Sequence, residues 1–218
     1  MNKESTAREM ILAGVRGALG AYAGSPLGPL PAAARFAARK ASSLDEEMER
    51  MLGEVERLNG RTRRVHGREE FAAALTELIK EEKIRTASFS DHPFYRPYGI
   101  GELLEHSGIE CVSPVGDGRR LATCDLGITV ADAALPETGT VLLRTTQGQV
   151  DALSLLPRVH LALVSPEAFV ADLQDAFALA KGDRHFVLVS GCSRTADIEK
   201  VLTLGVHGPK AYHLWVCD

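Results

Sequence analysis

The sequence predicts an α/β fold: a three-layer α/β/α domain around a mostly parallel sheet, preceded by an N-terminal helical arm. From residue 62 onward, short apolar runs with strand character alternate with segments of helical periodicity. Such alternation is typical of βαβ units, whose helices cover both faces of a parallel sheet. The chain has 218 residues and 45% hydrophobic content, enough to bury a full core without disulfide or metal support.

The N-terminal part of the sequence differs from this pattern. Ser5 to Tyr22 has helical spacing, and the segment after it is a linker by its Gly and Pro content. We therefore expect residues 1–43 to form a helical arm and linker, and residues 44–218 to form the α/β domain. Such an arm is as suited to packing on a partner chain as on its own domain, and a second copy of this chain is one such partner.

The domain begins with a helix predicted over 44–58, because its apolar residues share one face, its first turn is acidic and Asn59-Gly60 ends it. Further helices are predicted over 68–83, 99–108, 166–182 and 196–205. Strands are predicted over 62–65, 84–90, 109–114, 159–164, 185–189 and 211–217. ITVADAAL (128–135) and TGTVLLR (138–144) predict two more strands, joined by the tight turn Pro136–Gly139.

Composition excludes several functional classes. A net charge of -4 and a pI near 6.0 argue against general binding to nucleic acid or membrane surfaces. No apolar run could cross a bilayer and the N-terminus lacks a signal-peptide core, which predicts a cytoplasmic protein without membrane insertion. The four cysteines form no C-x-x-C pair, so no metal or iron–sulfur site is predicted, and the cofactor of any redox chemistry is unknown. Cys111 and Cys217 lie in apolar stretches and are expected in the core.

The loop SGCSRT (190–195) follows the strand predicted over 185–189. Ligands of open α/β sheets bind beyond the carboxyl ends of strands, and this loop is expected at such an end. Ser193 or Thr195 is suited to cap the next helix. Alternatively, the two hydroxyls and Arg194 bind an anion such as a carboxylate or phosphate. The local pattern alone favours capping.

Three residues are candidates for acid–base work. Asp132 and Glu137 lie near strand ends, where carboxylates can exchange protons, although Asp132 equally suits a turn cap. His207 precedes the last strand; an imidazole exchanges protons near neutral pH, but a loop histidine also commonly bonds a backbone carbonyl. His160 is expected to be a hydrogen-bonded core residue. The loop HPFYRPYG (92–99) either lines a pocket or packs passively.

Three motifs occur in order: DLGITVADAALPETGTVLL, LSLLPRVHLALV and SGCSRTADIEKVLTLGVHGPKAYHLWV. Together they resemble the lactate-utilisation (LUD-domain) family of the LutC and YkgG type. The family pattern usually reads G-P-S-R-T-A-D-I-E, and Cys192 stands here in place of the proline. The resemblance implies a fold like that of the ribose-phosphate isomerase, glucosamine-phosphate deaminase and CoA-transferase superfamily (NagB/RpiA/CoA-transferase-like). It also implies a role beside two iron–sulfur proteins in oxidising L-lactate to pyruvate.

Three hypotheses follow for the function. In the first, the chain is an accessory subunit of lactate oxidation that binds a small carboxylate or its redox partners. In the second, it is a free-standing enzyme acting on a sugar phosphate or acyl-CoA, since CoA transferases of this superfamily use a glutamate in a Glu-x-Gly turn. In the third, it is a binding or regulatory module. The candidate acid–base residues are Glu137, His207 and Asp132. The candidate anion-binding residues are Ser193, Arg194, Thr195, Gly139 and Thr138.

Overall fold

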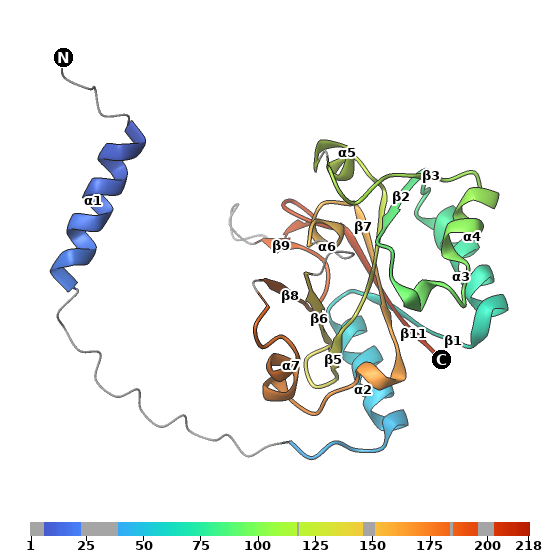
Figure 1. Ribbon diagram of the computed structural model, residues 1–218. Helices are drawn as coiled ribbons and strands as arrows, with labels where there is room; N and C mark the ends of the chain where they lie inside the picture. Colours follow the sequence, from blue (N-terminus) through green and yellow to red (C-terminus); the bar gives the residue numbers. More distant parts are fainter. Residues whose placement is uncertain (1–6, 23–38, 117, 146–150, 184, 196–202) are drawn as a thin grey trace. The chain divides into compact units, whose positions relative to one another are not determined.

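The computed structural model describes residues 7–22, 39–116, 118–145, 151–183, 185–195 and 203–218 (Figure 1). The chain divides into two compact units, with the boundary between Ala37 and Ala38. The described part of the first unit is helix α1, Ala7–Tyr22. Four of its large apolar side chains, Met10, Ile11, Val15 and Leu19, are exposed, from 49% at Val15 to 66% at Ile11. Within the described part of the chain, none of the helices combines the length and apolar character needed to cross a membrane.

The second unit is built on a six-stranded sheet with the strand order β1-β11-β7-β4-β2-β3, and all five pairings are parallel. The strands are β1 (Arg61–Val65), β2 (Thr86–Phe89), β3 (Glu110–Cys111), β4 (Leu126–Val130), β7 (Val159–Val164) and β11 (Ala211–Cys217). Every residue of β4 and β7 is buried, as expected for parallel strands covered on both faces. The predicted α/β fold with a mostly parallel sheet is confirmed.

Helices cover both faces of this sheet (Figure 1). On one face lie α3 (Gly67–Glu81) and α4 (Ile100–His106), whose apolar residues share a core with Leu161 and Trp215. On the other face α2 (Leu44–Arg57) packs Met51 against Leu214. Successive side chains of a strand point to opposite faces, so β7 and β11 contribute to both cores.

Helix α2 begins at the predicted residue because of a capping box. The Ser43 hydroxyl accepts from the Glu46 N–H, and the Glu46 carboxylate accepts from the Ser43 N–H at 3.1 Å. Glu47 is buried, forms an ion pair with Arg39 and accepts from the Ser42 N–H at 2.8 Å. Burial by itself raises the pKa of Glu47, but these hydrogen bonds outweigh it and the pKa is lowered. The ion pair from Arg39 and the hydrogen bond from Ser42 therefore hold the segment before α2 against this helix.

A three-stranded antiparallel sheet covers the rest of the α2 face, in the order β5 (Ala133–Leu135), β6 (Thr140–Arg144) and β8 (Phe186–Val189). The placement of 185–189 as a buried strand with its carboxyl end at the ligand-binding edge of the parallel sheet is wrong. β8 is half-buried or exposed throughout and pairs with β6 alone. A short apolar run suits any strand, and only the free edge of β6 decides its partner and direction.

Three further predictions need correction. The helix over 166–182 is divided: η2 (Pro166–Ala168) is a 3₁₀ turn, and α7 (Leu173–Leu179) begins after Asp172, whose carboxylate accepts from two N–H groups of the first turn. Residues 196–202 of the predicted last helix lie outside the described residues, but its end is strand β10 (Thr203–Leu204), paired with β9 (Arg194–Thr195). Cys111 is exposed because β3 is a two-residue edge strand, whereas Cys217 is buried as expected. The remaining helices are α5 (Gly118–Ala122), α6 (Ala152–Leu155) and the 3₁₀ turn η1 (Pro93–Tyr95).

Candidate functional site

A cavity of about 330 Å³ lies beside the β5–β6 turn, and we call it the Glu137 cavity. It is bounded by this turn, the end of β8 and the start of α7. Its lining residues are Leu135, Glu137, Thr138, Thr140, Ala171, Asp172, Leu173, Leu188 and Ser190. Both Glu137 and Thr138 are exposed, as expected for a turn at the mouth of a cavity. The cavity thus unites two of the predicted site residues with the first residue after β8.

Three hydroxyl groups form a chain along one wall of this cavity. Ser190 Oγ lies 2.7 Å from Thr140 Oγ1, which in turn lies 2.7 Å from Thr138 Oγ1. A hydroxyl both donates and accepts, so such a chain can pass a hydrogen bond on to a ligand oxygen. β6 and β8 pair along their length, and this pairing places Ser190 beside Thr140.

Two carboxylates give the Glu137 cavity a negative character. Asp172 is occupied as the cap of α7, where its Oδ1 accepts from the N–H groups of Gln174 (2.8 Å) and Asp175 (3.1 Å). Within the described part of the chain, Glu137 makes no ion pair and no hydrogen bond, and the cavity lining contains no cationic side chain. The arrangement favours proton exchange or nucleophilic attack by Glu137 over the binding of a free anion.

Gly139 turns the chain from Glu137 back toward α2. Its φ of +61° is in the region that favours glycine, and a Cβ there would lie 3.0 Å from the Val55 nitrogen. Gly139 is buried against α2, and it is not among the residues that line the cavity. A glycine at this position therefore allows the turn that carries Glu137 to pack directly against α2.

The SGCSRT loop wraps around the C-terminal end of the same helix. The Arg194 guanidinium donates a hydrogen bond to the carbonyl of Leu58, the residue that caps α2. The Cys192 thiol is buried and contacts the carbonyl of Asn59 at 3.6 Å. A cation at this position complements the unpaired carbonyls and the dipole of the helix end. Arg194 thus has a structural partner 136 residues away along the chain.

Ser193 lies against the turn that carries His207. Its N–H donates to the Pro209 carbonyl at 3.0 Å, and its carbonyl accepts from the Gly205 N–H at 2.8 Å. Thr195 pairs with Thr203 across the β9–β10 ribbon. The capping predicted for Ser193 or Thr195 concerns a helix start that lies outside the described residues. His207 is exposed. These two hydrogen bonds hold Ser193 beside the turn that carries His207.

Asp132 lies at the opposite end of the β5–β6 hairpin from Glu137. Its Oδ2 accepts from the Arg144 N–H at 2.8 Å. Burial raises the pKa of Asp132, although the hydrogen bond from Arg144 and the nearby charges of Arg144 and His92 act against this. The whole of β5 separates the two carboxylates, so the structure does not bring Asp132 and Glu137 into one site.

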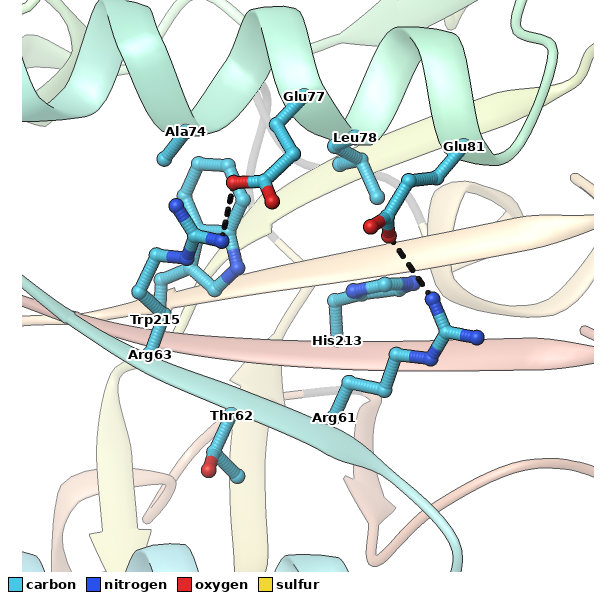
Figure 2. A pocket seen from close by; sticks show the side chains of 9 residues that line it. All are labelled: Arg61, Thr62, Arg63, Ala74, Glu77, Leu78, Glu81, His213 and Trp215. Atoms are coloured by element: carbon cyan, nitrogen blue, oxygen red, sulfur yellow. Dashed lines mark hydrogen bonds and ion pairs between the residues drawn. The ribbon is translucent and has the colours of Figure 1, made fainter.

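A groove between edge strand β1 and α3 is the second place where charged side chains gather (Figure 2). Its four long charged side chains form two ion pairs, Arg63–Glu77 at 2.5 Å and Arg61–Glu81 at 3.0 Å. Because these charges are mutually satisfied, we assign the groove a structural role in protecting the sheet edge. Among the described residues, no three His, Cys, Asp or Glu side chains gather in a way that could hold a metal ion.

Comparison with known proteins decides the family. The LUD domain model matches residues 48–216, which include the Glu137 turn, the SGCSRT loop and the His207 turn. The chain belongs to the LUD domain family. Cys192 therefore takes the position of the proline in the usual pattern of the LUD family without leaving the core.

Curated relatives of the chain are named for lactate utilisation. The chain is 33% identical over 156 residues to "Lactate utilization protein C 1" of Bacillus mycoides, covering 65% of this chain and 67% of that protein. It is 31% identical over 148 residues to "Lactate utilization protein C" of Halalkalibacterium halodurans, covering 62% and 64%. The chain thus spans about two thirds of the length of these relatives.

The fold has a counterpart among solved structures. A DUF162 family protein from Deinococcus radiodurans superposes with a TM-score of 0.62, covering 82% of this chain and 100% of that one. The sequence identity is 18%, so this likeness supports the fold alone.

Sequence reasoning missed part of the Glu137 cavity. Asp172 directly precedes α7, and aspartate is a common helix N-cap. The prediction of one helix over 166–182 placed Asp172 inside that helix, so its capping role was missed. Thr140 and Ser190 carried no signal, because their hydroxyls meet only through the pairing of β6 with β8. The LUD motifs therefore indicate which segments matter, whereas the contacts between them require the structure.

Proposed function

We propose that this LUD protein is an accessory component of L-lactate utilisation that acts with iron–sulfur partner proteins in the cytoplasm to oxidise L-lactate to pyruvate. The observation that carries the proposal is the alignment of relatives named Lactate utilization protein C over 148 to 156 residues at 31% to 33% identity. Oxidation of lactate to pyruvate releases two electrons and two protons. In this proposal the partners' clusters accept the electrons.

The Glu137 cavity is our candidate for the proton chemistry of this role. Glu137 is exposed at the cavity mouth, beside a chain of three hydroxyls that can orient a ligand oxygen. Its carboxylate has no competing ion pair within the described part of the chain. Asp132 is engaged with the Arg144 backbone, which makes Glu137 the stronger candidate of the two. His207 would assist from its exposed turn.

Anion binding by Ser193, Arg194 and Thr195 is a further part of the proposal. A guanidinium carries five N–H donors, and one of those of Arg194 is used by Leu58. The remaining donors support contact with a carboxylate presented by a substrate or by a partner protein. Thr138 would contribute a hydroxyl from the neighbouring turn, and Gly139, buried against α2, would set the backbone of that turn.

Complementation of a strain that lacks this protein tests the role. Growth on L-lactate should return with the wild-type chain and fall at least tenfold in rate with Glu137→Gln, whereas Glu49→Gln on the exposed face of α2 serves as the matched control. The tagged wild-type chain should also co-purify with iron–sulfur proteins from lactate-grown cells. Growth on lactate that proceeds at the wild-type rate without the chain would contradict the proposal.

A second candidate function rests on the same exposed carboxylate. Glu137-Thr138-Gly139 has the local form of the Glu-x-Gly turn, and the adjoining cavity gives the carboxylate access to an acyl-CoA or a sugar phosphate. Attack by the carboxylate on an acyl-CoA would form a mixed anhydride and release CoA thiolate. Attack of this thiolate on the glutamyl carbonyl would then give a glutamyl thioester and release the acyl group as a free carboxylate. Intact-mass measurement after incubation with several acyl-CoAs tests this, since Glu137→Gln must abolish any adduct.

A further inference from the structure

A second pocket, which we call the β2 pocket, lies where the strand order of the parallel sheet reverses. From β2 the chain continues to β3 at one edge, whereas from β4 it continues to β7 on the other side. In open α/β sheets, ligands bind in the crevice beyond the carboxyl ends of strands at such a reversal. A pocket of about 350 Å³ opens at the carboxyl end of β2, between the 89–96 loop and the start of α4.

Ser90 is a buried polar group that lines this pocket. It is 1% exposed, and its hydroxyl has no hydrogen-bond partner among the described residues. Tyr95 lies close by, and its hydroxyl donates to the Ile128 carbonyl at 3.1 Å. The Ser90 hydroxyl acts on Tyr95 against the burial that raises the pKa of that phenol, but it forms no hydrogen bond of good geometry with it. An unpartnered buried hydroxyl costs free energy that a ligand oxygen would recover. The Ser90 hydroxyl therefore points to a ligand with an oxygen at this depth.

His92 and Arg96 add hydrogen-bond donors to the same lining. The Phe94 N–H donates to His92 Nδ1 at 3.2 Å, so the ring's hydrogen lies on Nε2 when the imidazole is neutral. Arg96 is exposed, and within the described residues its guanidinium takes part in no ion pair or hydrogen bond. Together with Ser90 these side chains supply a hydroxyl, an imidazole N–H and a guanidinium fork.

Neighbouring carboxylates limit the charge that the pocket accepts. Glu102 also lines it, but Arg68 holds this carboxylate at 2.8 Å and balances its charge. Asp91 leaves one negative charge beside Arg96, and Asp132 lies within electrostatic reach of His92 from the end of β4. A ligand with a single negative charge suits this balance better than a multiply charged phosphate.

We propose that the β2 pocket binds a small carboxylate with an oxygen on the adjacent carbon, that is, a 2-hydroxy or 2-oxo acid. Arg96 would hold the carboxylate with two parallel hydrogen bonds, and Ser90 and His92 Nε2 would hold the adjacent oxygen. The Glu137 cavity, lined by carboxylates, is the poorer place for this anion. The carboxylate class rests on the pocket alone, whereas L-lactate and pyruvate as probes rest on the proposed function.

Calorimetric titration of the full chain with L-lactate, pyruvate and inorganic phosphate tests the proposal. We expect both carboxylates to bind in the millimolar range and more tightly than phosphate. Arg96→Gln should raise their Kd at least tenfold, because it removes a charge-assisted pair of hydrogen bonds. Arg57→Gln replaces an exposed arginine at the end of α2 and should leave the Kd unchanged.

Ser90→Ala separates a ligand contact from a structural role. Removing a buried hydroxyl without a partner should leave the folding stability unchanged or higher, whereas the Kd for L-lactate should rise about fivefold, as for a lost neutral hydrogen bond. Lower stability with unchanged Kd would overturn the assignment of Ser90 as a ligand contact.

The failure of this site and the failure of the proposed function are distinguishable. Absence of carboxylate binding to the wild-type chain, a preference for phosphate, or an Arg96→Gln variant that binds as the wild type would each overturn the β2 pocket. Loss of binding on Arg194→Gln but not on Arg96→Gln would move the anion to the SGCSRT loop. A chain that restores growth on lactate yet fails these titrations disproves the pocket alone, and one that binds carboxylates yet fails to restore growth disproves the lactate role alone.

Discussion

His160 should make the stability of this protein depend on pH in a specific way. The residue lies in the middle of β7 and is fully buried, with its Nε2 2.8 Å from Thr129 Oγ1 and its ring 5.3 Å from that of Tyr212. Burial lowers the pKa of His160 from 6.5 to about 3, and the nearby charge of His213 acts in the same direction. The folded protein therefore holds this imidazole neutral.

The sign and size of the effect follow from these two values. Between about 3 and 6.5 the unfolded chain binds a proton at His160 that the folded protein rejects, so the free energy of unfolding falls as the pH falls. Each pKa unit corresponds to about 1.4 kcal/mol. Lowering the pH from about 7.5 to about 5 should thus remove about 2 kcal/mol. Asp125 and Asp183, whose pKa values are lowered, lose their stabilisation only as the pH falls toward and below their ordinary value of 3.8.

Urea denaturation followed by the fluorescence of Trp215, the single tryptophan, measures this loss. The wild type should lose about 2 kcal/mol more than His160→Gln over this pH range. His106→Gln, at an exposed position, controls for the loss of an imidazole as such. His213 contributes to both proteins equally, so the difference between them isolates His160. Equal pH dependence in the wild type and His160→Gln would refute the conclusion that burial keeps this residue neutral.

Three further predictions concern single residues. Arg39→Met should lower the free energy of unfolding by about 3 kcal/mol, because it leaves the buried Glu47 carboxylate without its cation, and the loss is measured by chemical denaturation. Gly127→Ala should lower the free energy of unfolding by about 3 kcal/mol in the same assay, since its Cβ would lie 2.1 Å from the Leu153 carbonyl oxygen. A denaturation midpoint equal to that of the wild type would contradict the packing. Ile11→Glu on the exposed apolar face of α1 should reduce self-association, or association with iron–sulfur partners, measured by light scattering and co-purification.

Local signals in the sequence determined the elements that depend on near neighbours. Helix α2 is predicted over 44–58 and observed as Leu44–Arg57. The prediction succeeds because the capping residues and the apolar face of this helix all lie within about fifteen consecutive residues. β7 and β11 were likewise predictable, since apolar runs bounded by turns suit strands buried on both faces. The LUD motifs determined the family from the sequence alone.

Long-range contacts decided what those segments do. The strand 185–189 joined an antiparallel sheet because β6 had the free edge, which no local pattern reports. For the same reason the partner of Arg194 is a helix end far away in the sequence, and the hydroxyls of Thr140 and Ser190 meet only across paired strands.

The β2 pocket shows the same division. The sequence marked 92–99 as a loop that either lines a pocket or packs passively, and both readings suited its composition. Burial of Ser90 without a partner and the reversal of strand order between β2 and β4 are properties of the assembled sheet. Local sequence sets backbone preferences within a few residues, whereas burial and charge pairing depend on chain segments that only folding brings together.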